Sequence, residues 1–204
     1  MAILCRKFYV GNTVEIARKL LGKYLVRRLG GETLVCRITE TEAYVGAIDK
    51  ACHAYGYRKT GRNAAMFGDP GHAYLYLIYG MYTCLNFVTN PAGEPDAVLL
   101  RGMEPVSGLE TMSRLRFGKP SAALTAYQRK NFCNGPGKCC KALSLDTALN
   151  GCDLTGDTLF LCDSLTDIGL AEAPPLPRRI IVDKRIGIDY AEEAKDFPWR
   201  FILC

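Results

Sequence analysis

Hydrophobic residues recur with helical spacing between residues 12 and 22, near the start of the chain. Asn12 is a typical helix-capping residue, and Glu15 follows it at the spacing of a capping box. Gly22 is suited to end the helix, because glycine readily adopts the left-handed backbone that closes many helices. The apolar side chains between these ends fall on one stripe: Val14, Ile16, Ala17, Leu20 and Leu21. The pattern predicts an amphipathic helix over 12–22.

Alternating apolar and polar positions follow this helix and predict two β-hairpins. The segments KYLVRRL and ETLVCRITETEAYV flank the dipeptide Gly30-Gly31, which is a two-residue turn signal. The segments AYLYLI and TCLNFV flank a second turn at residues 79–82, and DAVLLRGMEP follows as a further strand. We therefore expect at least five strands in the first half of the chain, most of them antiparallel to their neighbours.

The other segments complete an α+β pattern. Residues 47–72 show no sustained period and contain many turn formers, which predicts a long, ordered, functional loop. Ser107 and Glu110 have capping-box spacing and predict a helix that ends near Arg116. The remaining expected elements are a helix around Pro136–Leu143, strands at 157–162 and 179–183, the surface connector EAPPLPR and a terminal strand PWRFILC. We predict a single domain over 1–204 with helices around a mixed, mainly antiparallel sheet.

Charge and hydropathy narrow the class of protein. The chain has 26 basic and 21 acidic residues, a net charge of +5. This excess permits a polyanionic partner without requiring one. The stretch 73–88 has no charged residue but is shorter than the ~20 residues that a membrane-spanning helix needs, and no secretion signal opens the chain. We expect no membrane partner and a cytoplasmic location, at the nucleoid in a bacterium or in the nucleus in a eukaryote.

The 10 cysteines are scattered along the chain and favour free thiols over disulfides. In a reducing compartment such thiols fill apolar space. Cys139 and Cys140 are adjacent instead of forming a CxxC pair, and the chain has only 2 histidines. The paired ligand spacing of a zinc site is missing. We therefore expect no metal.

The segment ITETEAYVG carries the first candidate chemistry. On a strand, Glu40, Glu42 and Tyr44 share one face. The simpler interpretation is a solvated edge. The functional interpretation is a carboxylate base beside an aromatic ring, with a pKa that burial raises toward neutrality.

The tyrosine-rich hairpin and the loop before it carry the second candidate. Its turn presents Tyr79 without any neighbouring charge. Either this tip is covered by other elements, or it is an apolar wedge of the kind that enters stacked bases. The preceding loop holds His53 and a basic cluster of Arg58, Lys59 and Arg62, which either meets phosphates or is a solvated loop.

Taken in order along the chain, these motifs resemble the alkyladenine DNA glycosylases, the 3-methyladenine glycosylases of the mammalian type. The resemblance rests on IARKLLGK, ETEAY, His53, RKTGRNAAMF, YLYLIYGMYTCLN, VLLRGMEP, SGLETM, NGPGKCCKAL and RIGIDYAEEAKDFPWRF. It spans nearly the whole chain. It implies an open, barrel-like sheet with surrounding helices and a protruding β-hairpin.

The resemblance also implies a role for each matched residue. Glu42 is expected to activate the attacking water. Tyr44 and His53 are expected to form one wall of a base pocket and Tyr76 the facing wall. The remaining roles are intercalation by Tyr79, exclusion of normal guanine by Asn86, and contacts with the DNA backbone by Arg58, Thr60, Arg62 and Arg101.

The implied reaction is base-excision repair of duplex DNA. The enzyme flips out a purine such as 3-methyladenine, 7-methylguanine, hypoxanthine or ethenoadenine and hydrolyses its N-glycosidic bond. The resemblance implies a monofunctional hydrolase that leaves an abasic site without cutting the strand, and a monomer that uses no cofactor. Two rivals stay open: a non-catalytic binder of distorted or single-stranded nucleic acid, and an enzyme acting on a small molecule.

Overall fold

Antiparallel hairpins form the framework of the fold, as the alternating pattern predicts. The computed structural model describes residues 3–175 and 179–204, so residues 176–178 of the predicted EAPPLPR connector lie outside the described part. Gly30 and Gly31 have φ angles of 59° and 84° and close the first hairpin. The strands are β1 (Tyr24–Leu29), β2 (Glu32–Tyr44), β3 (Ala73–Ile78), β4 (Tyr82–Thr89), β5 (Asp96–Ser107), β6 (Leu159–Cys162), β7 (Ile180–Asp183) and β8 (Arg200–Leu203).

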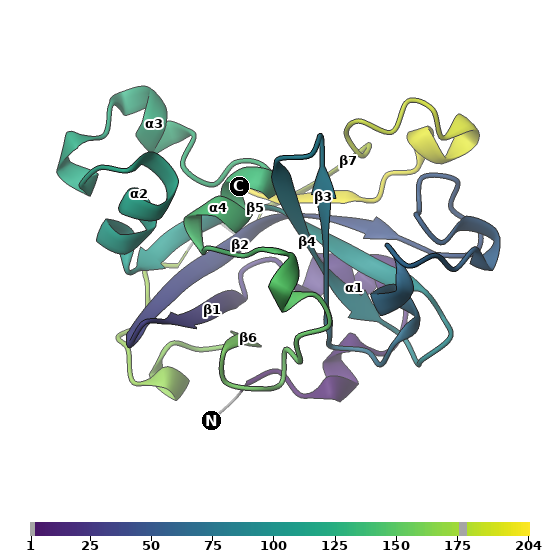
Figure 1. Ribbon diagram of the computed structural model, residues 1–204, viewed down its shortest axis with the longest axis horizontal. Helices are drawn as coiled ribbons and strands as arrows, with labels where there is room; N and C mark the ends of the chain where they lie inside the picture. Colours follow the sequence, from purple (N-terminus) through teal and green to yellow (C-terminus); the bar gives the residue numbers. More distant parts are fainter. Residues whose placement is uncertain (1–2, 176–178) are drawn as a thin grey trace.

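One curled sheet contains all these strands in the order β3-β4-β5-β2-β1-β6, with β8 paired to β2 and β7 paired to β8. Their pairings are antiparallel. The long strand β2 shifts register against β5 on both sides of Glu40. Such bulges bend a strand and increase its twist. They let β2 pair with β1 through its first half and with β8 near its end, which gives the open half-barrel that the resemblance implies (Figure 1).

In the described part of the chain, four α-helices surround the sheet, and two of them pack on it most extensively through their apolar side chains. They are α1 (Thr13–Lys19), α2 (Leu109–Phe117), α3 (Ala126–Lys130) and α4 (Pro136–Ala142). Helix α1 packs on β2 and β5, and α4 packs on β4 and β5. The Asn12 side chain accepts a 3.1 Å hydrogen bond from the Glu15 N–H, which confirms the predicted cap. Buried residues of α1, α2 and α4 join the largest apolar cluster, which includes Phe87 and Leu100 of the sheet.

One local prediction was wrong, and one short helix was missed. Ser107 ends β5 and Gly108 caps α2, so the expected capping box at Ser107 and Glu110 does not form. Glu110 instead accepts a hydrogen bond from the backbone N–H of Ser121. The short helix α3 was not predicted, although Thr125 and Gln128 form a capping box at its start.

Candidate active site

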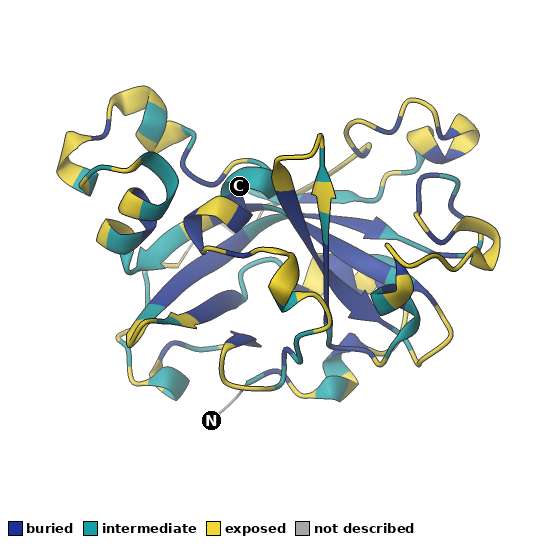
Figure 2. Ribbon diagram, viewed as in Figure 1, coloured by how far each residue is buried: buried dark blue, intermediate teal, exposed yellow. Residues whose placement is uncertain are grey.

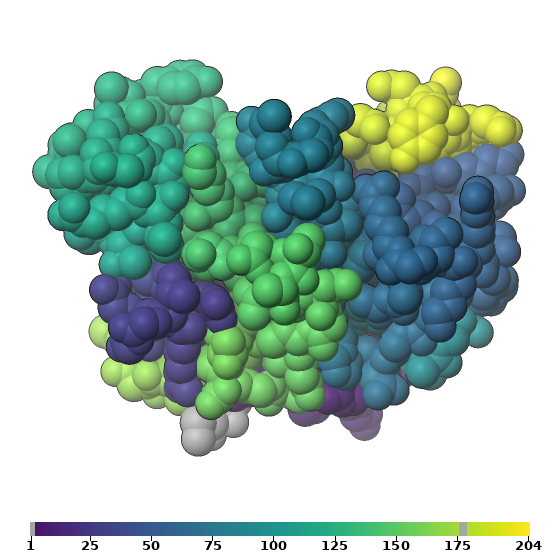
Figure 3. All heavy atoms as spheres, viewed as in Figure 1, coloured from purple at the N-terminus to yellow at the C-terminus, as the bar shows by residue number. Residues whose placement is uncertain are grey.

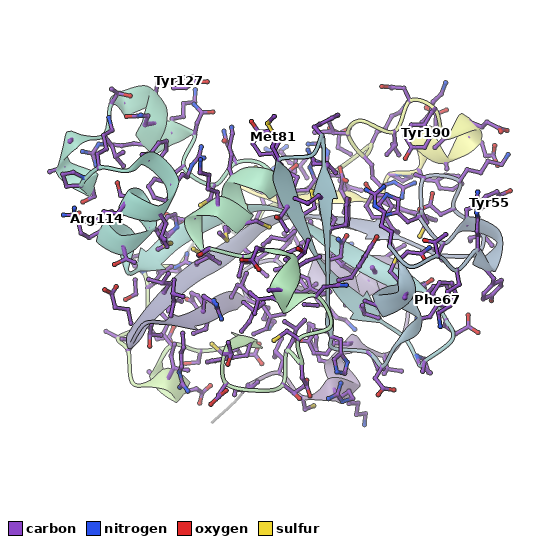
Figure 4. All side chains as sticks on the ribbon, in the orientation of Figure 1. Tyr55, Phe67, Met81, Arg114, Tyr127 and Tyr190 are labelled. Atoms are coloured by element: carbon purple, nitrogen blue, oxygen red, sulfur yellow. The ribbon has the colours of Figure 1, made fainter. Side chains whose placement is uncertain are left out.

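The hairpin of β3 and β4 stands out from the sheet with an exposed, uncharged tip (Figure 2). Tyr79 and Gly80 both have positive φ angles, 51° and 68°, which turn the chain within three residues. Tyr79 is 86% exposed and Met81 is 69% exposed. The alternative in which other elements cover this tip is therefore wrong. The hairpin rises between the lobe of α2 and α3 and the C-terminal segment around Tyr190, along one edge of the molecule (Figures 3 and 4).

A cavity of about 320 Å³ opens beside this hairpin. That volume is in the range of small-molecule sites. Its lining comes from β2, the loop before β3, the whole β3–β4 hairpin with its turn, β5, the start of α4 and the segment after β7. Six of the predicted site residues line it: Tyr44, His53, Tyr76, Tyr79, Asn86 and Arg101. The fold thus gathers residues that are far apart in the sequence.

Glu42 lies beneath this lining, and its side chain has no exposed surface. Its Oε2 accepts a 2.8 Å hydrogen bond from the Tyr44 hydroxyl. Its Oε1 accepts a 2.9 Å bond from the Ile186 N–H and lies 3.3 Å from Arg101 Nη1. A carboxylate has about four lone-pair sites, so one site on Oε2 is left for a further donor. The solvated-edge interpretation of this strand is wrong.

Burial raises the pKa of Glu42 above its usual range, and the Arg101 guanidinium, the Ile186 N–H and the Tyr44 hydroxyl oppose this rise. A carboxyl poised in this way suits general-base chemistry near neutral pH. Tyr44 stays protonated, because burial and the neighbouring Glu42 carboxylate raise its own pKa. It therefore acts as a hydrogen-bond donor to Glu42.

Glu40 and Glu42 share one face of the strand, as predicted. The Arg101 side chain contacts both carboxylates, which shows that they point the same way. Arg101 Nε is 3.3 Å from Glu40 Oε1, and Arg200 Nη1 is 3.0 Å from the same oxygen. The Arg101 side chain is only 13% exposed. The Arg101 guanidinium already forms ion pairs with Glu40 and Glu42. The contact with the DNA backbone that the resemblance implies for Arg101 stays a prediction.

The aromatic walls are arranged differently from the expectation. The rings of His53 and Tyr76 touch, with centroids 4.6 Å apart and planes at 73°. No base fits between them, so the expectation that His53 joins Tyr44 and faces Tyr76 was wrong. His53 Nδ1 and the buried Tyr74 hydroxyl are 2.9 Å apart, which fixes the imidazole ring. Burial and the nearby Arg62 charge lower the pKa of His53, so the ring is neutral at physiological pH.

Asn86 is buried on β4 and lines the cavity. It pairs with Tyr74 across the hairpin, and its Nδ2 donates a 3.2 Å hydrogen bond to the Tyr74 carbonyl. This bond anchors the amide at the cavity wall. The expected exclusion of guanine by Asn86 stays a prediction.

The basic loop is ordered by Asn63, whose Nδ2 donates to the carbonyls of His53 and Arg58 at 2.8 and 2.9 Å. Thr60 donates both its N–H and its hydroxyl to Asn63 Oδ1. Arg62 donates to the Leu77 carbonyl at 3.2 Å, and its guanidinium lies 5.1 Å from the Tyr76 ring centroid. Arg62 therefore ties the loop to the hairpin. Arg58 is exposed, and the backbone contacts expected of Arg58, Thr60 and Arg62 stay predictions.

The sequence did not single out the segment after β7 as part of the site. Ile186, Gly187, Ile188 and Tyr190 line the cavity, and the Ile186 N–H bonds Glu42. The sequence motif RIGIDY is one of the motifs on which the family resemblance rests, and this was the available signal. Neither periodicity nor residue type distinguishes these positions. Among the described residues, no group of three metal-ligating side chains lies together, and no helix there is long and apolar enough to cross a membrane.

Comparison with known proteins shows which family the chain resembles along its length. The family described as Methylpurine-DNA glycosylase (MPG) matches residues 7–204. A Clostridium perfringens protein is 47% identical over 204 residues, covering 98% of this chain and 95% of its own length. An Alkaliphilus oremlandii protein is 49% identical, covering 97% of this chain and 94% of its own length. Both relatives carry the name "Putative 3-methyladenine DNA glycosylase".

Proposed function

The chain belongs to the methylpurine-DNA glycosylase family, a family of base-excision repair enzymes, and from that premise we propose which lesions it takes and how it removes them. Its substrate is duplex DNA that contains an alkylated or deaminated purine, such as 3-methyladenine, 7-methylguanine, hypoxanthine or ethenoadenine. It flips the damaged nucleotide into the cavity beside the hairpin and hydrolyses the N-glycosidic bond. The products are the free base and an abasic site.

The observation that carries this proposal is the environment of Glu42. A fully buried carboxylate is held by the Tyr44 hydroxyl, the Ile186 N–H and the Arg101 guanidinium directly behind an aromatic cavity. Desolvation favours the protonated form of such a group and raises its basicity. The free lone pair on Oε2 is the position at which a water would be held.

In the proposed step, Glu42 takes a proton from this water as the water oxygen bonds to C1′ of the deoxyribose. The C1′–N bond breaks, and its electron pair leaves with the purine. Alkylation at N3 or N7 gives the purine a positive charge and makes it a good leaving group. One carboxylate base then suffices, whereas the sugar hydrolases use a pair of carboxyl groups. Because water is the nucleophile, no covalent intermediate forms and the strand is not cut.

The aromatic residues offset the cost of base flipping. Unstacking and unpairing a nucleotide costs a few kcal/mol, and stacking on an aromatic ring returns ~1–3 kcal/mol per base. We propose that the base stacks between Tyr44 and the touching pair His53 and Tyr76. A cationic purine is further favoured by the electron-rich faces of these rings.

Outside the cavity, the hairpin and the basic loop meet the duplex. The exposed Tyr79 enters the gap that the flipped nucleotide leaves. Inside the cavity, Asn86 excludes normal guanine through its amide. Arg58 and Thr60 contact the backbone beside the lesion, and Arg62 and Arg101 reach phosphates only if they leave the partners described above. The protein acts as a monomer on one lesion at a time.

Base release from duplex oligonucleotides that carry one lesion each, measured as abasic sites, tests the proposal. We expect the wild-type protein to release at least one of these bases without cutting the strand. Glu42→Gln should lower single-turnover release by orders of magnitude while lesion DNA still binds. Binding of lesion DNA without release by the wild type would favour the non-catalytic binder. Unchanged release by Glu42→Gln would show that another group is the base.

A further inference from the structure

A buried ion pair lies next to the cavity, on residues that the proposed chemistry does not use. The side chains of Asp49 and Arg185 both have no exposed surface. The guanidinium binds the carboxylate with two parallel bonds, from Nη1 to Oδ2 at 2.5 Å and from Nη2 to Oδ1 at 2.9 Å. These residues are 136 positions apart in the chain, so the pair joins the loop before β3 to the segment after β7.

Arg185 also contacts the strand that carries Glu42 and the segment after β7, where its Nη2 donates a 3.0 Å hydrogen bond to the Ala194 carbonyl. Arg185 Nη1 donates a 2.9 Å hydrogen bond to the carbonyl of Ala43, the residue that follows Glu42. The guanidinium lies over two rings, 4.7 Å from the centroid of Tyr44 and 5.1 Å from that of Trp199. Arg185 therefore holds the backbone on one side of Glu42 and the ring of the tyrosine that donates to it.

The residue after Arg185 contacts Glu42 directly. The Ile186 N–H donates to Glu42 Oε1 at 2.9 Å, and the Tyr44 hydroxyl donates to Oε2 at 2.8 Å. Two of the three groups that hold the carboxylate are thus attached to, or packed on, Arg185. The third, Arg101, comes from β5 and does not depend on the pair.

Stability alone gives no reason for such a pair. Desolvating two charges is costly, and apolar side chains of similar volume often replace a buried ion pair without loss of stability. Apolar side chains could not, however, hold the Ala43 carbonyl. Charged, bidentate pairing also fixes orientation more narrowly than apolar contact does.

We propose that Asp49 and Arg185 are positioning residues for Glu42. The pair locks Tyr44 and the Ile186 N–H onto the two carboxylate oxygens, and so sets the direction in which the base points at its water. This inference rests on the proposed function, since it assigns a role within the same reaction.

The pair also contributes to the electrostatics of Glu42. The charged and titratable groups around Glu42 include Arg101 and Arg200 with Glu40, Tyr44 on the same strand, Tyr76 across the cavity, and Arg185 with Asp49. Cys84 faces Arg101, and Cys52 and Tyr190 face the Asp49–Arg185 pair. The Arg185 charge is one of the groups that lower the pKa of Glu42. Removing this charge should raise that pKa. Removing the Asp49 charge leaves the Arg185 charge unneutralised and should lower it.

Asp49→Asn and Arg185→Met test the proposal through the pH dependence of single-turnover base release. We expect each variant to release the base about 10–100-fold more slowly than wild type, with the dissociation constant for lesion duplex changed by less than about threefold. The acid limb of the rate profile should move to lower pH in Asp49→Asn and to higher pH in Arg185→Met. Asp196→Asn is the matched control, because it removes an exposed ion pair with Lys184 on the same segment and should change neither quantity.

Wild-type release together with its loss in Glu42→Gln establishes the proposed function independently of these variants. Folded Asp49→Asn and Arg185→Met proteins with wild-type rates would overturn the positioning role. The role would equally be overturned by rates that fall with no shift in the acid limb or with the same shift in both variants. Failure of both variants to fold, judged by thermal melting, would make the pair purely structural and also overturn it.

Discussion

Removal of the Tyr79 side chain tests how the protein opens a duplex. Tyr79 is 86% exposed and contributes little to the core, so Tyr79→Ala should melt close to the wild-type temperature. A ring that fills the gap left by a flipped nucleotide replaces stacking worth ~1–3 kcal/mol. Losing it lowers the extruded fraction about 5–150-fold. Because only the extruded nucleotide reacts, single-turnover release from a duplex should fall by the same factor.

The assay compares a lesion in a duplex with the same lesion in the strand alone. A single strand offers no paired stack for the ring to fill, so Tyr79→Ala and wild type should release the base at equal rates there. Tyr127→Ala is a matched control, since Tyr127 is also a highly exposed tyrosine, at 75%, but lies on α3. Wild-type activity of Tyr79→Ala on duplex, or an equal loss on both substrates, would refute the wedge.

Two further substitutions probe the site and its support. Tyr44→Phe removes the donor 2.8 Å from Glu42 Oε2, a bond that lowers the pKa of Glu42. Since the base must be ionised, release is lost as pH falls through that pKa, and the acid limb should move to higher pH; a move to lower pH would contradict this. Gly46→Ala places a methyl 2.5 Å from the Pro95 carbonyl oxygen. Urea unfolding should show a loss of about 1–3 kcal/mol, whereas Gly61→Ala, which meets no atom within 4 Å, should stay within about 0.5 kcal/mol; equal values would show that the contact is not tight.

Local patterns predicted much of the framework and part of the site. The tip of the second hairpin was predicted from alternation and from the glycine at position 80, and the structure confirms it. Glu40, Glu42 and Tyr44 were predicted to share a face because a strand alternates its side chains, and their contacts with Arg101 and with each other confirm this. These predictions succeed because they depend on residues within a few positions of one another.

Predictions that needed long-range packing were incomplete or wrong. The contact of His53 with Tyr76 depends on how the loop folds back over β3, and the sequence contains no measure of that approach. The capping box at Ser107 was lost because β5 continues through that residue in the sheet. Tertiary pairing therefore overrode a local signal that is otherwise reliable.

The sequence by itself determined the hairpins, the aromatic residues at the second turn and the carboxylate on its strand, because short-range alternation and turn chemistry specify them. Only the tertiary structure decided the surroundings that make Glu42 a candidate base. Arg101 and Ile186 reach it from strands and segments far along the chain, and Asp49 meets Arg185 across 136 positions. The physical reason is that a side chain is buried or ion-paired only when segments from distant parts of the chain pack around it. Which segments meet is decided by the packing of the whole sheet.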